Sequence, residues 1–233
     1  GISCPNIAFI KYWGNRDEAL RLPSNGSISM NLDGLTSTTR VTFDPTLEAD
    51  CLTLNGAPVH GPGLQRAVDL LERVRRLAGL RWRADVRSEN NFPTGAGIAS
   101  SASGFAALAV AAACAAGLGG ESGASDERRL SRLARTASGS ACRSIPGGFV
   151  EWLPGQDDES SYAETIAPAG HWALVDCIAV ISLAHKATVS QDGHARAGSS
   201  PLQTGRVAGA AQRLSACRNA IHTRDFDALA AVM

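Results

Sequence analysis

One stretch of the sequence concentrates the small and hydroxyl-bearing residues that anion binding uses. Residues 90–104 read NNFPTGAGIASSASG, follow a predicted strand and lead into a predicted helix. Backbone N–H groups can approach an anion closely where side chains are small, and a helix N-terminus adds partial positive charge. The hydroxyls of Ser100, Ser101 and Ser103 can donate to phosphate oxygens or hold a metal-bound water. The stretch is neither a Walker motif nor a dinucleotide fingerprint; the alternative is a tight turn with ordinary capping serines.

A second cluster combines hydroxyl groups with a guanidinium. Residues 138–144 read SGSACRS and are followed by IPGG. Ser138, Ser140 and Arg143 can therefore surround a phosphate or a carboxylate from a flexible backbone. Arginine suits this task because its planar fork matches two oxygens at once. The alternative is a solvated turn between a helix and a strand.

A lysine flanked by aromatic residues lies near the start of the sequence. Residues 11–17 read KYWGNRD, and Asn6 precedes them in an otherwise apolar segment. Lys11 can supply positive charge to a phosphoryl group, as ATP sites require. Alternatively, Tyr12 and Trp13 are core residues beside a lysine whose stem lies along apolar surface. We expect the polar run over 23–29 to line the same cleft.

A fourth candidate group follows residues 174–183, an apolar stretch that is predicted to be a strand. His185, Lys186 and Ser190 come after it, and residues at strand ends commonly face a cleft. The other histidines have no visible partners, and we interpret them as surface or satisfied side chains: His60, His171, His194 and His222.

Periodicity predicts the elements that would position these groups. Alternation predicts strands over 37–44 and 82–87, and residues 52–56 read LTLNG, a strand that enters a hairpin turn. Apolar residues at helical spacing predict a helix over 64–78 that stops at Gly79. The nearly uncharged residues 99–118 are mostly alanine, which contributes little to membrane insertion, so we predict a buried helix.

Further elements are predicted in the second half of the sequence. Ser125 is a good N-cap for a helix with two acidic residues in its first turn. Residues 149–153 are predicted to be a strand and 156–161 a polar surface loop. From Thr204 onward, apolar spacing predicts a last amphipathic helix. Strands and helices mix without regular alternation, which indicates an α+β fold instead of a doubly wound sheet.

Composition argues against two classes of partner. The 22 basic and 22 acidic side chains cancel, so there is no overall electrostatic attraction to nucleic acid or to an anionic membrane. The six scattered cysteines show no metal-ligand spacing. They indicate a reducing compartment, and we expect a cytoplasmic protein. The opening residues GISCPNIAFIKYWG lack the order of a signal peptide.

In this order, the segments together resemble the mevalonate diphosphate decarboxylases of the GHMP kinase superfamily. A generic GHMP kinase would share only the glycine- and serine-rich loop. The resemblance covers nearly the whole sequence through four segments, residues 5–14, 90–104, 138–151 and 199–202. It implies a GHMP kinase fold with two lobes and the site between them. The first lobe, like ribosomal protein S5 domain 2, would span 1–170; the start of a ferredoxin-like lobe would span 171–233, after a composition break near His171.

The resemblance also implies a reaction. ATP with magnesium would phosphorylate the tertiary 3-hydroxyl of a phosphorylated mevalonate, and this phosphate would leave as the carboxylate is lost as carbon dioxide. Phosphate is a good leaving group, whereas hydroxide is a poor one. An electron-poor centre would develop at C3, so the pocket should stabilise charge and needs no covalent nucleophile. The resemblance further implies a homodimer.

Position in the family motifs assigns residues to each ligand. Lys11, Ser101 and Arg143 would be the catalytic residues, with Ser101 the candidate magnesium contact. The ATP phosphates would be held by the loop residues Gly95, Gly97, Ala99, Ser100, Ser101 and Ser103. The substrate would be bound by Tyr12, Ser138, Ser140, Arg143 and Ser190.

The sequence departs from the family pattern in two places. A second lysine, associated with the diphosphate of the substrate, is expected where Asn15 stands, although Arg16 can compensate for it. This loss of a cation favours the phosphomevalonate decarboxylases, which use a monophosphate, as an alternative. The family also carries an aspartate in an Asp-x-Gly-Pro-Asn-type motif that acts on the 3-hydroxyl, and this sequence lacks that motif. We therefore expect a partial version of a longer protein, with an inactive polypeptide as the alternative.

Three functional hypotheses follow. The first is an ATP-dependent decarboxylase that gives isopentenyl diphosphate from diphosphomevalonate, or isopentenyl phosphate from the monophosphate. The second is a GHMP mevalonate 3-kinase that phosphorylates without decarboxylation. The third is a non-catalytic binding protein that retains the fold.

Overall fold

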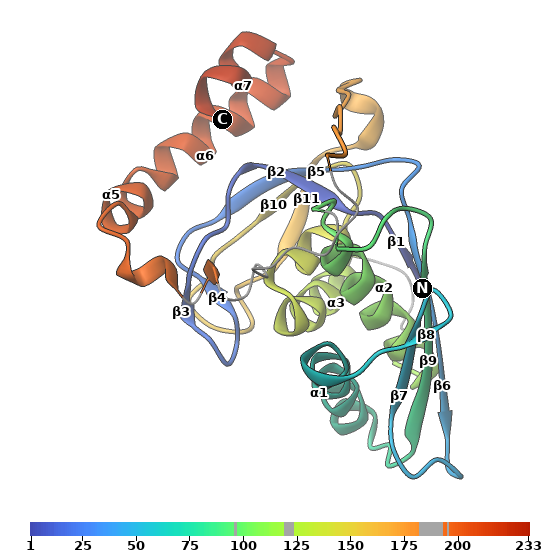
Figure 1. Ribbon diagram of the computed structural model, residues 1–233. Helices are drawn as coiled ribbons and strands as arrows, with labels where there is room; N and C mark the ends of the chain where they lie inside the picture. Colours follow the sequence, from blue (N-terminus) through green and yellow to red (C-terminus); the bar gives the residue numbers. More distant parts are fainter. Residues whose placement is uncertain (96, 119–123, 182–192, 195) are drawn as a thin grey trace.

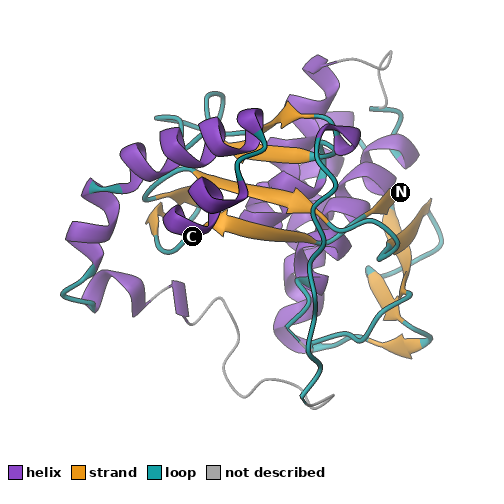
Figure 2. Cartoon of the chain, turned by 90° about the horizontal axis from the view of Figure 1, so that it is seen from above, coloured by secondary structure: helices purple, strands orange, loops and turns teal. Residues whose placement is uncertain are grey.

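The chain forms two larger β-sheets with a layer of helices between them (Figure 1). Further helices lie on the outer face of the second sheet, so the strands of that sheet run between two helical layers (Figure 2). The fold is α+β, as the sequence predicted. The computed structural model describes residues 1–95, 97–118, 124–181, 193–194 and 196–233.

The first sheet buries only one of its faces. In spatial order its strands are β1 (Ile2–Ser3), β6 (Ser37–Asp44), β9 (Arg83–Asn90), β7 (Cys51–Leu54) and β8 (Ala57–Pro58). Every second side chain of β6 and β9 is buried along most of their length, including Val41 and Val86. The predicted strands over 37–44 and 82–87 and the hairpin turn between β7 and β8 are confirmed.

Three helices cover the inner face of this sheet: α1 (Gly61–Ala78), α2 (Ser100–Ala115) and α3 (Ala124–Ala137). As predicted, α1 ends at Gly79, whose φ of +65° is left-handed. The small side chains of α2 let its neighbours pack closely, and nine of its residues are buried. Ser125 lies inside the first turn of α3 instead of capping it, because that helix already begins at Ala124. Within the described part of the chain, no helix is long and apolar enough to cross a membrane.

The second sheet separates a polar interior from an apolar outer layer. In spatial order its strands are β11 (Ala163–Ala167), β10 (Phe149–Trp152), β5 (Ser27–Asn31) and β2 (Asn6–Ile10). Two helices pack on its outer face, α6 (Ala210–Thr223) and α7 (Phe226–Val232). Ile28 and Met30 of β5 pack with α6, whereas Ser27 and Ser29 face the opposite way. Period-2 alternation in one strand thus supplies both a core and a row of hydroxyls.

Several shorter elements complete the frame. They are the hairpin strands β3 (Asn15–Asp17) and β4 (Leu22–Pro23), the 3-10 helices η1 (Gly139–Ser144), η2 (Ala169–His171) and η3 (Ala197–Ser199), and helix α5 (Gln203–Ala208). The predicted strand over 149–153 and the predicted loop over 156–161 are confirmed.

Two predictions for the second half of the sequence are wrong. The described part of the predicted strand over 174–183 has no regular secondary structure, and Val175 and Ile181 are 90% and 97% exposed. A strand needs a neighbour for its N–H and C=O groups, and no described strand pairs with this segment. The single helix predicted from Thr204 is also divided, because α5 ends at Ala208 and α6 begins at Ala210.

Candidate active site

Arg143 forms a buried positive charge at the centre of the site. Its side chain is only 3% exposed; Nη1 donates to Ser27 Oγ at 2.6 Å. Nε donates to Asn6 Oδ1 at 3.2 Å and to Ser29 Oγ at 3.1 Å. All three acceptors are neutral, and no carboxylate forms an ion pair with Arg143 among the residues described. Burial lowers the pKa of this guanidinium, yet arginine stays charged. A buried cation with only neutral partners favours a bound anion.

Asn6 connects this guanidinium to the rest of the site. It lies in β2, and its Nδ2 donates to the carbonyl oxygen of Ser140 at 3.1 Å and to Ser144 Oγ at 2.8 Å. Asn6 therefore fixes η1 and Arg143 together. Ser138 precedes η1 as its N-cap residue and is buried, but its hydroxyl makes no capping hydrogen bond. The predicted cluster over 138–144 is thus a folded cradle, not a solvated turn.

Lys11 supplies a second positive charge beside Arg143. It follows the end of β2, and its side chain reaches solvent. Partial desolvation, followed by the positive charge of Arg143, lowers the pKa of Lys11, whereas Asp176 raises it. A cation that lowers the pKa of a neighbouring lysine in this way favours a ligand with negative charge between the two.

Tyr12 lies in a stack of aromatic rings next to η1. Its ring centroid is 4.7 Å from that of Trp152 and 4.1 Å from that of His194. A Cβ atom on Gly139 would lie 2.7 Å from Tyr12 Cε1, so only glycine fits there. Burial raises the pKa of Tyr12 to about 12. At neutral pH the phenol is therefore a hydrogen-bond donor.

Asn15 stands where the family resemblance implies a second lysine. Its side chain is neutral and lies next to the carboxylate of Glu18. The hydroxyl of Tyr12 donates to Asn15 Oδ1, and Asn15 Nδ2 donates to Glu18 Oε2 at 2.7 Å. Arg16 donates through Nη2 to the carbonyl oxygens of Pro154, at 3.1 Å, and Gly155, and it lines the same hollow as Asn15, so compensation by Arg16 stays a prediction.

A hollow of about 620 Å³ opens beside this aromatic stack, with walls from the β3 region, His194 and α5. His194 Nδ1 accepts from the N–H of Gly14 at 3.1 Å. Burial lowers the pKa of His194 to about 4, so the ring is neutral at pH 7. The sequence interpretation of a satisfied histidine is correct for its hydrogen bond. It missed that His194 packs against Tyr12.

The glycine- and serine-rich loop connects β9 to α2. Gly95 and Gly97 have left-handed φ values of +78° and +97°, and Ala99, which precedes α2, has φ +52°. Ala99 offers no side-chain cap, and the first turn of α2 contains no acidic residue. The N–H groups of this turn therefore keep their partial positive charge for an anion. Ser101 is exposed there, and Ser100 Oγ accepts from the N–H of Gly95 at 3.3 Å.

Ser103 holds the loop from its inner side. It is fully buried, and its hydroxyl lies 2.7 Å from Ser37 Oγ. Ser37 Oγ donates to Asn90 Oδ1 at 2.5 Å, and Asn90 Nδ2 donates to Thr94 Oγ1 at 2.9 Å. This chain of polar contacts fixes both ends of the loop. Ser103 therefore helps to position the loop through its contact with Ser37 of β6.

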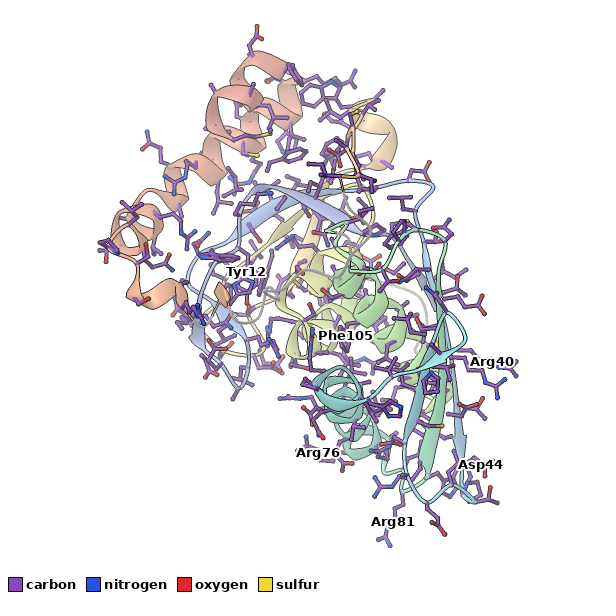
Figure 3. The ribbon with its side chains drawn as sticks, in the orientation of Figure 1. Tyr12, Arg40, Asp44, Arg76, Arg81 and Phe105 are labelled. Carbon is purple, nitrogen blue, oxygen red and sulfur yellow. The ribbon has the colours of Figure 1, made fainter. Side chains whose placement is uncertain are left out.

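The fold brings the two predicted clusters together because η1 packs on α2. In Figure 3, Tyr12 marks the side of η1, because its ring packs against Gly139, and Phe105, one turn beyond Ser101, marks α2. Arg40 and Asp44 project from the outer face of the first sheet, away from both. Ser190, predicted to contact substrate, lies outside the described residues together with His185 and Lys186.

The available donors fit a magnesium ion carried by phosphate. Among the residues described, no group of three or more His, Cys, Asp or Glu side chains could hold a metal. Magnesium accepts hard oxygen ligands and commonly takes most of them from phosphate and water. The exposed hydroxyl of Ser101 at the start of α2 suits that arrangement.

Comparison with known proteins identifies the family. The family described as diphosphomevalonate decarboxylase-like N-terminal domain matches residues 3–163. The chain belongs to this family. It is 42% identical to the diphosphomevalonate decarboxylase of Ganoderma lucidum, over 97% of this chain and 60% of that relative.

Solved structures of the family share this fold. A complex of MDDEF with MVAPP, AMPPCP and magnesium has a TM-score of 0.88 and 40% identity, covering 99% of this chain and 70% of that one. A mevalonate diphosphate decarboxylase from Enterococcus faecalis has a TM-score of 0.85 and 39% identity, covering 99% and 69%. The chain spans about 60% of the length of the first curated relatives it matches.

Proposed function

We propose that this chain provides the nucleotide- and substrate-binding part of an ATP-dependent decarboxylase that converts diphosphomevalonate to isopentenyl diphosphate in isoprenoid biosynthesis. The observation that carries the proposal is Arg143, a buried cation with neutral partners on a 3-10 helix that packs against α2, the helix with the uncapped N-terminus. Membership of the diphosphomevalonate decarboxylase-like family supports the same function.

The nucleotide belongs at the loop before α2. Gly95, Gly97 and Ala99 give its backbone a left-handed shape that no β-branched side chain could adopt cheaply. Ser100 and Ser101 would then donate to the phosphates, with Ser101 contacting magnesium; Ser103 would hold the loop in place. ATP and magnesium as cofactors agree with the AMPPCP and magnesium found in the solved MDDEF complex.

The substrate belongs at η1 and the end of β2. Arg143 and Lys11 would bind its negative groups, and Ser138, Ser140 and Tyr12 would orient them. Ser190 remains part of this proposal on the family pattern alone.

The proposed reaction balances as ATP plus diphosphomevalonate giving ADP, phosphate, carbon dioxide and isopentenyl diphosphate. The 3-hydroxyl takes the γ-phosphoryl group of ATP. The C3–O bond then breaks with its electron pair going to phosphate, and the C1–C2 bond supplies the electrons of the new double bond as carbon dioxide leaves. In this scheme Lys11 and Arg143 orient the substrate and stabilise developing negative charge.

A monophosphate is the second candidate substrate, and Asn15 favours it. The side chain of Asn15 is neutral and donates to the Glu18 carboxylate, so this position provides no cation for a further phosphate. An enzyme of this kind would give isopentenyl phosphate.

The wider organisation of the protein is also inferred from the family pattern. We place a nucleotide-binding lobe at 1–170 and the beginning of a second lobe at 171–233, in a cytoplasmic homodimer. Sedimentation of the purified protein tests the dimer, and cell fractionation tests the location.

Product analysis of the full-length protein tests the function. ATP and magnesium are supplied with the mono- or the diphosphate of mevalonate, and ADP and carbon dioxide are measured together. Equal amounts of both products from the diphosphate are expected. Equal amounts of both products from the monophosphate alone would show that the monophosphate is the substrate. ADP without carbon dioxide would indicate a 3-kinase, and the absence of both products would indicate a binding protein.

A further inference from the structure

Two arginines from distant parts of the sequence meet at the C-terminal end of α3. Arg21, from the turn between β3 and β4, donates through Nε to the carbonyl oxygen of Thr136 at 2.9 Å. Arg66, from α1, donates through Nε to the next carbonyl oxygen, that of Ala137, at 3.0 Å. Consecutive carbonyls thus hold two like charges side by side. Neither arginine forms an ion pair with a carboxylate in the part of the chain that the structure describes.

Capping of α3 does not account for this pair. Cations do stabilise helix C-termini, but each guanidinium uses only Nε for its carbonyl. The fork of Nη groups, which is the part that matches phosphate oxygens, makes no hydrogen bond to any described residue. Burial and the charge of Arg21 lower the pKa of Arg66 to about 10, as expected where two cations lack an anion.

The backbone at Arg21 is held in a costly conformation. Its φ is +49°, in the left-handed region that non-glycine residues rarely adopt. Two arginines from outside the turn hold it through its carbonyl oxygens. Arg73 donates to the carbonyl oxygen of Ala19 at 3.3 Å, and Arg135 donates to that of Leu20 at 3.0 Å. Strain that the surroundings enforce is often found at functional sites.

The pair lies between the two binding clusters. The guanidinium of Arg66 lies 4.3 Å from the ring centroid of Phe105, which is one turn beyond Ser101 on α2 (Figure 3). Arg21 is close enough to Tyr12 and His194 for its charge to act on both. Arg66 therefore lies against the helix that follows the glycine- and serine-rich loop, and Arg21 lies near the aromatic residues of the substrate cluster.

We propose that Arg21 and Arg66 form an additional phosphoryl-binding site at the junction of the nucleotide and substrate clusters. The identity of the ligands of this site rests on the proposed function. The chemistry of the site does not, because the forks of two neighbouring guanidinium groups match phosphate oxygens. The phosphate can belong to the nucleotide or to the substrate, and Arg21 supplies a cation that Asn15 does not.

Calorimetric titration of the chain tests this site without any turnover. AMPPCP with magnesium and diphosphomevalonate are titrated separately into the unmodified chain, Arg21→Gln and Arg66→Gln. Loss of one charge-assisted contact should raise the Kd of at least one ligand by about tenfold or more, and Arg21→Lys should recover part of that loss. The ligand that weakens identifies the source of the phosphate.

Arg73→Gln is the matched control, because Arg73 holds the same turn and its one hydrogen bond to a described residue is to the carbonyl oxygen of Ala19. Its Kd values should stay within about twofold of the unmodified chain, and denaturation midpoints report whether each variant folds. The proposal is overturned if both ligands bind both glutamine variants normally, if Arg73→Gln weakens binding equally, or if the unmodified chain binds neither ligand. If the glutamine variants bind a ligand more weakly but the full-length protein releases no carbon dioxide, the phosphoryl-binding site is supported and the decarboxylase function is rejected.

Discussion

The loop before α2 and the cradle around Arg143 prepare for anions in opposite ways. The loop contains no charged side chain between Gly95 and Ser103, and it presents backbone N–H groups through left-handed glycines. The cradle relies on one formal charge, which neutral oxygens of Asn6, Ser27 and Ser29 hold in place. The first site depends on backbone shape, whereas the second depends on a single side chain.

This difference predicts which substitutions should impair each site. A loop made of backbone groups tolerates side-chain changes that preserve φ and ψ, but not a Cβ atom where φ is positive. A buried cation tolerates no change of charge, because its neutral neighbours cannot replace it. Substitutions should therefore separate nucleotide binding from substrate binding.

The largest effect is expected from Arg143→Gln. Loss of the buried charge should raise the Kd of diphosphomevalonate by about 100-fold or more, from roughly 3 kcal/mol for a charged hydrogen bond. Calorimetry should show AMPPCP binding within about threefold of normal, which would sharpen the contrast. Arg40→Gln, on the outer face of the first sheet (Figure 3), should change the Kd of neither ligand. Equal losses of both ligands in Arg143→Gln would break the comparison.

Gly139→Ala tests the packing of the cradle. The new Cβ would lie 2.7 Å from Tyr12 Cε1, so the ring must move, at about 1–3 kcal/mol of unfolding free energy. Substrate affinity should fall with it, and AMPPCP affinity should not. Gly147→Ala is the control, since nothing lies within 4 Å of that Cβ. A variant as stable as the control would show that Tyr12 is not confined.

Gly97→Ala tests the loop. A residue other than glycine at φ +97° costs about 1–2 kcal/mol, so the Kd of AMPPCP should rise about tenfold while substrate binding is retained. Gly117→Ala carries a comparable strain at φ +72° in open space. Calorimetry of both variants separates strain at the site from strain elsewhere; similar AMPPCP affinities in the two would argue against a backbone-built site.

The smallest effect concerns His194 and pH. Its folded pKa of about 4 is below the unfolded value near 6.5, so the unfolded chain binds more protons between these values. Stability should therefore be fully present above pH 7 and fall by about 1–2 kcal/mol as pH drops from 6.5 to 4. In urea denaturation, His194→Phe should flatten this part of the profile and His60→Phe should not. An unchanged slope in His194→Phe would show that His194 is not held neutral.

Local patterns predicted much of the fold and the loop. Alternation identified β6 and β9, and small residues before a helix identified Gly95 and Gly97, because both signals lie within a few residues of sequence. The cluster of Ser138, Ser140 and Arg143 was found in the same way. The polar run over 23–29 was expected at the cleft. Its Ser24 lines the hollow, whereas Ser27 and Ser29 are fully buried and accept hydrogen bonds from Arg143.

Contacts between distant segments could not be predicted. Trp152 and His194 meet Tyr12 only after folding, and Arg21 meets Arg66 only at the end of α3. The strand expected over 174–183 failed for the related reason that a strand depends on its neighbours, which an apolar pattern does not supply.

The most direct test of the account is a crystal structure of the chain with AMPPCP, magnesium and diphosphomevalonate. The account predicts AMPPCP phosphate oxygens within hydrogen-bond distance of the N–H groups at the start of α2. It also predicts a negative group of the substrate on Nη2 of Arg143, which makes no hydrogen bond to any described residue. Phosphates bound elsewhere, such as in the outer hollow lined by Arg40 and Arg87, with Arg143 still surrounded by neutral groups alone, would contradict it.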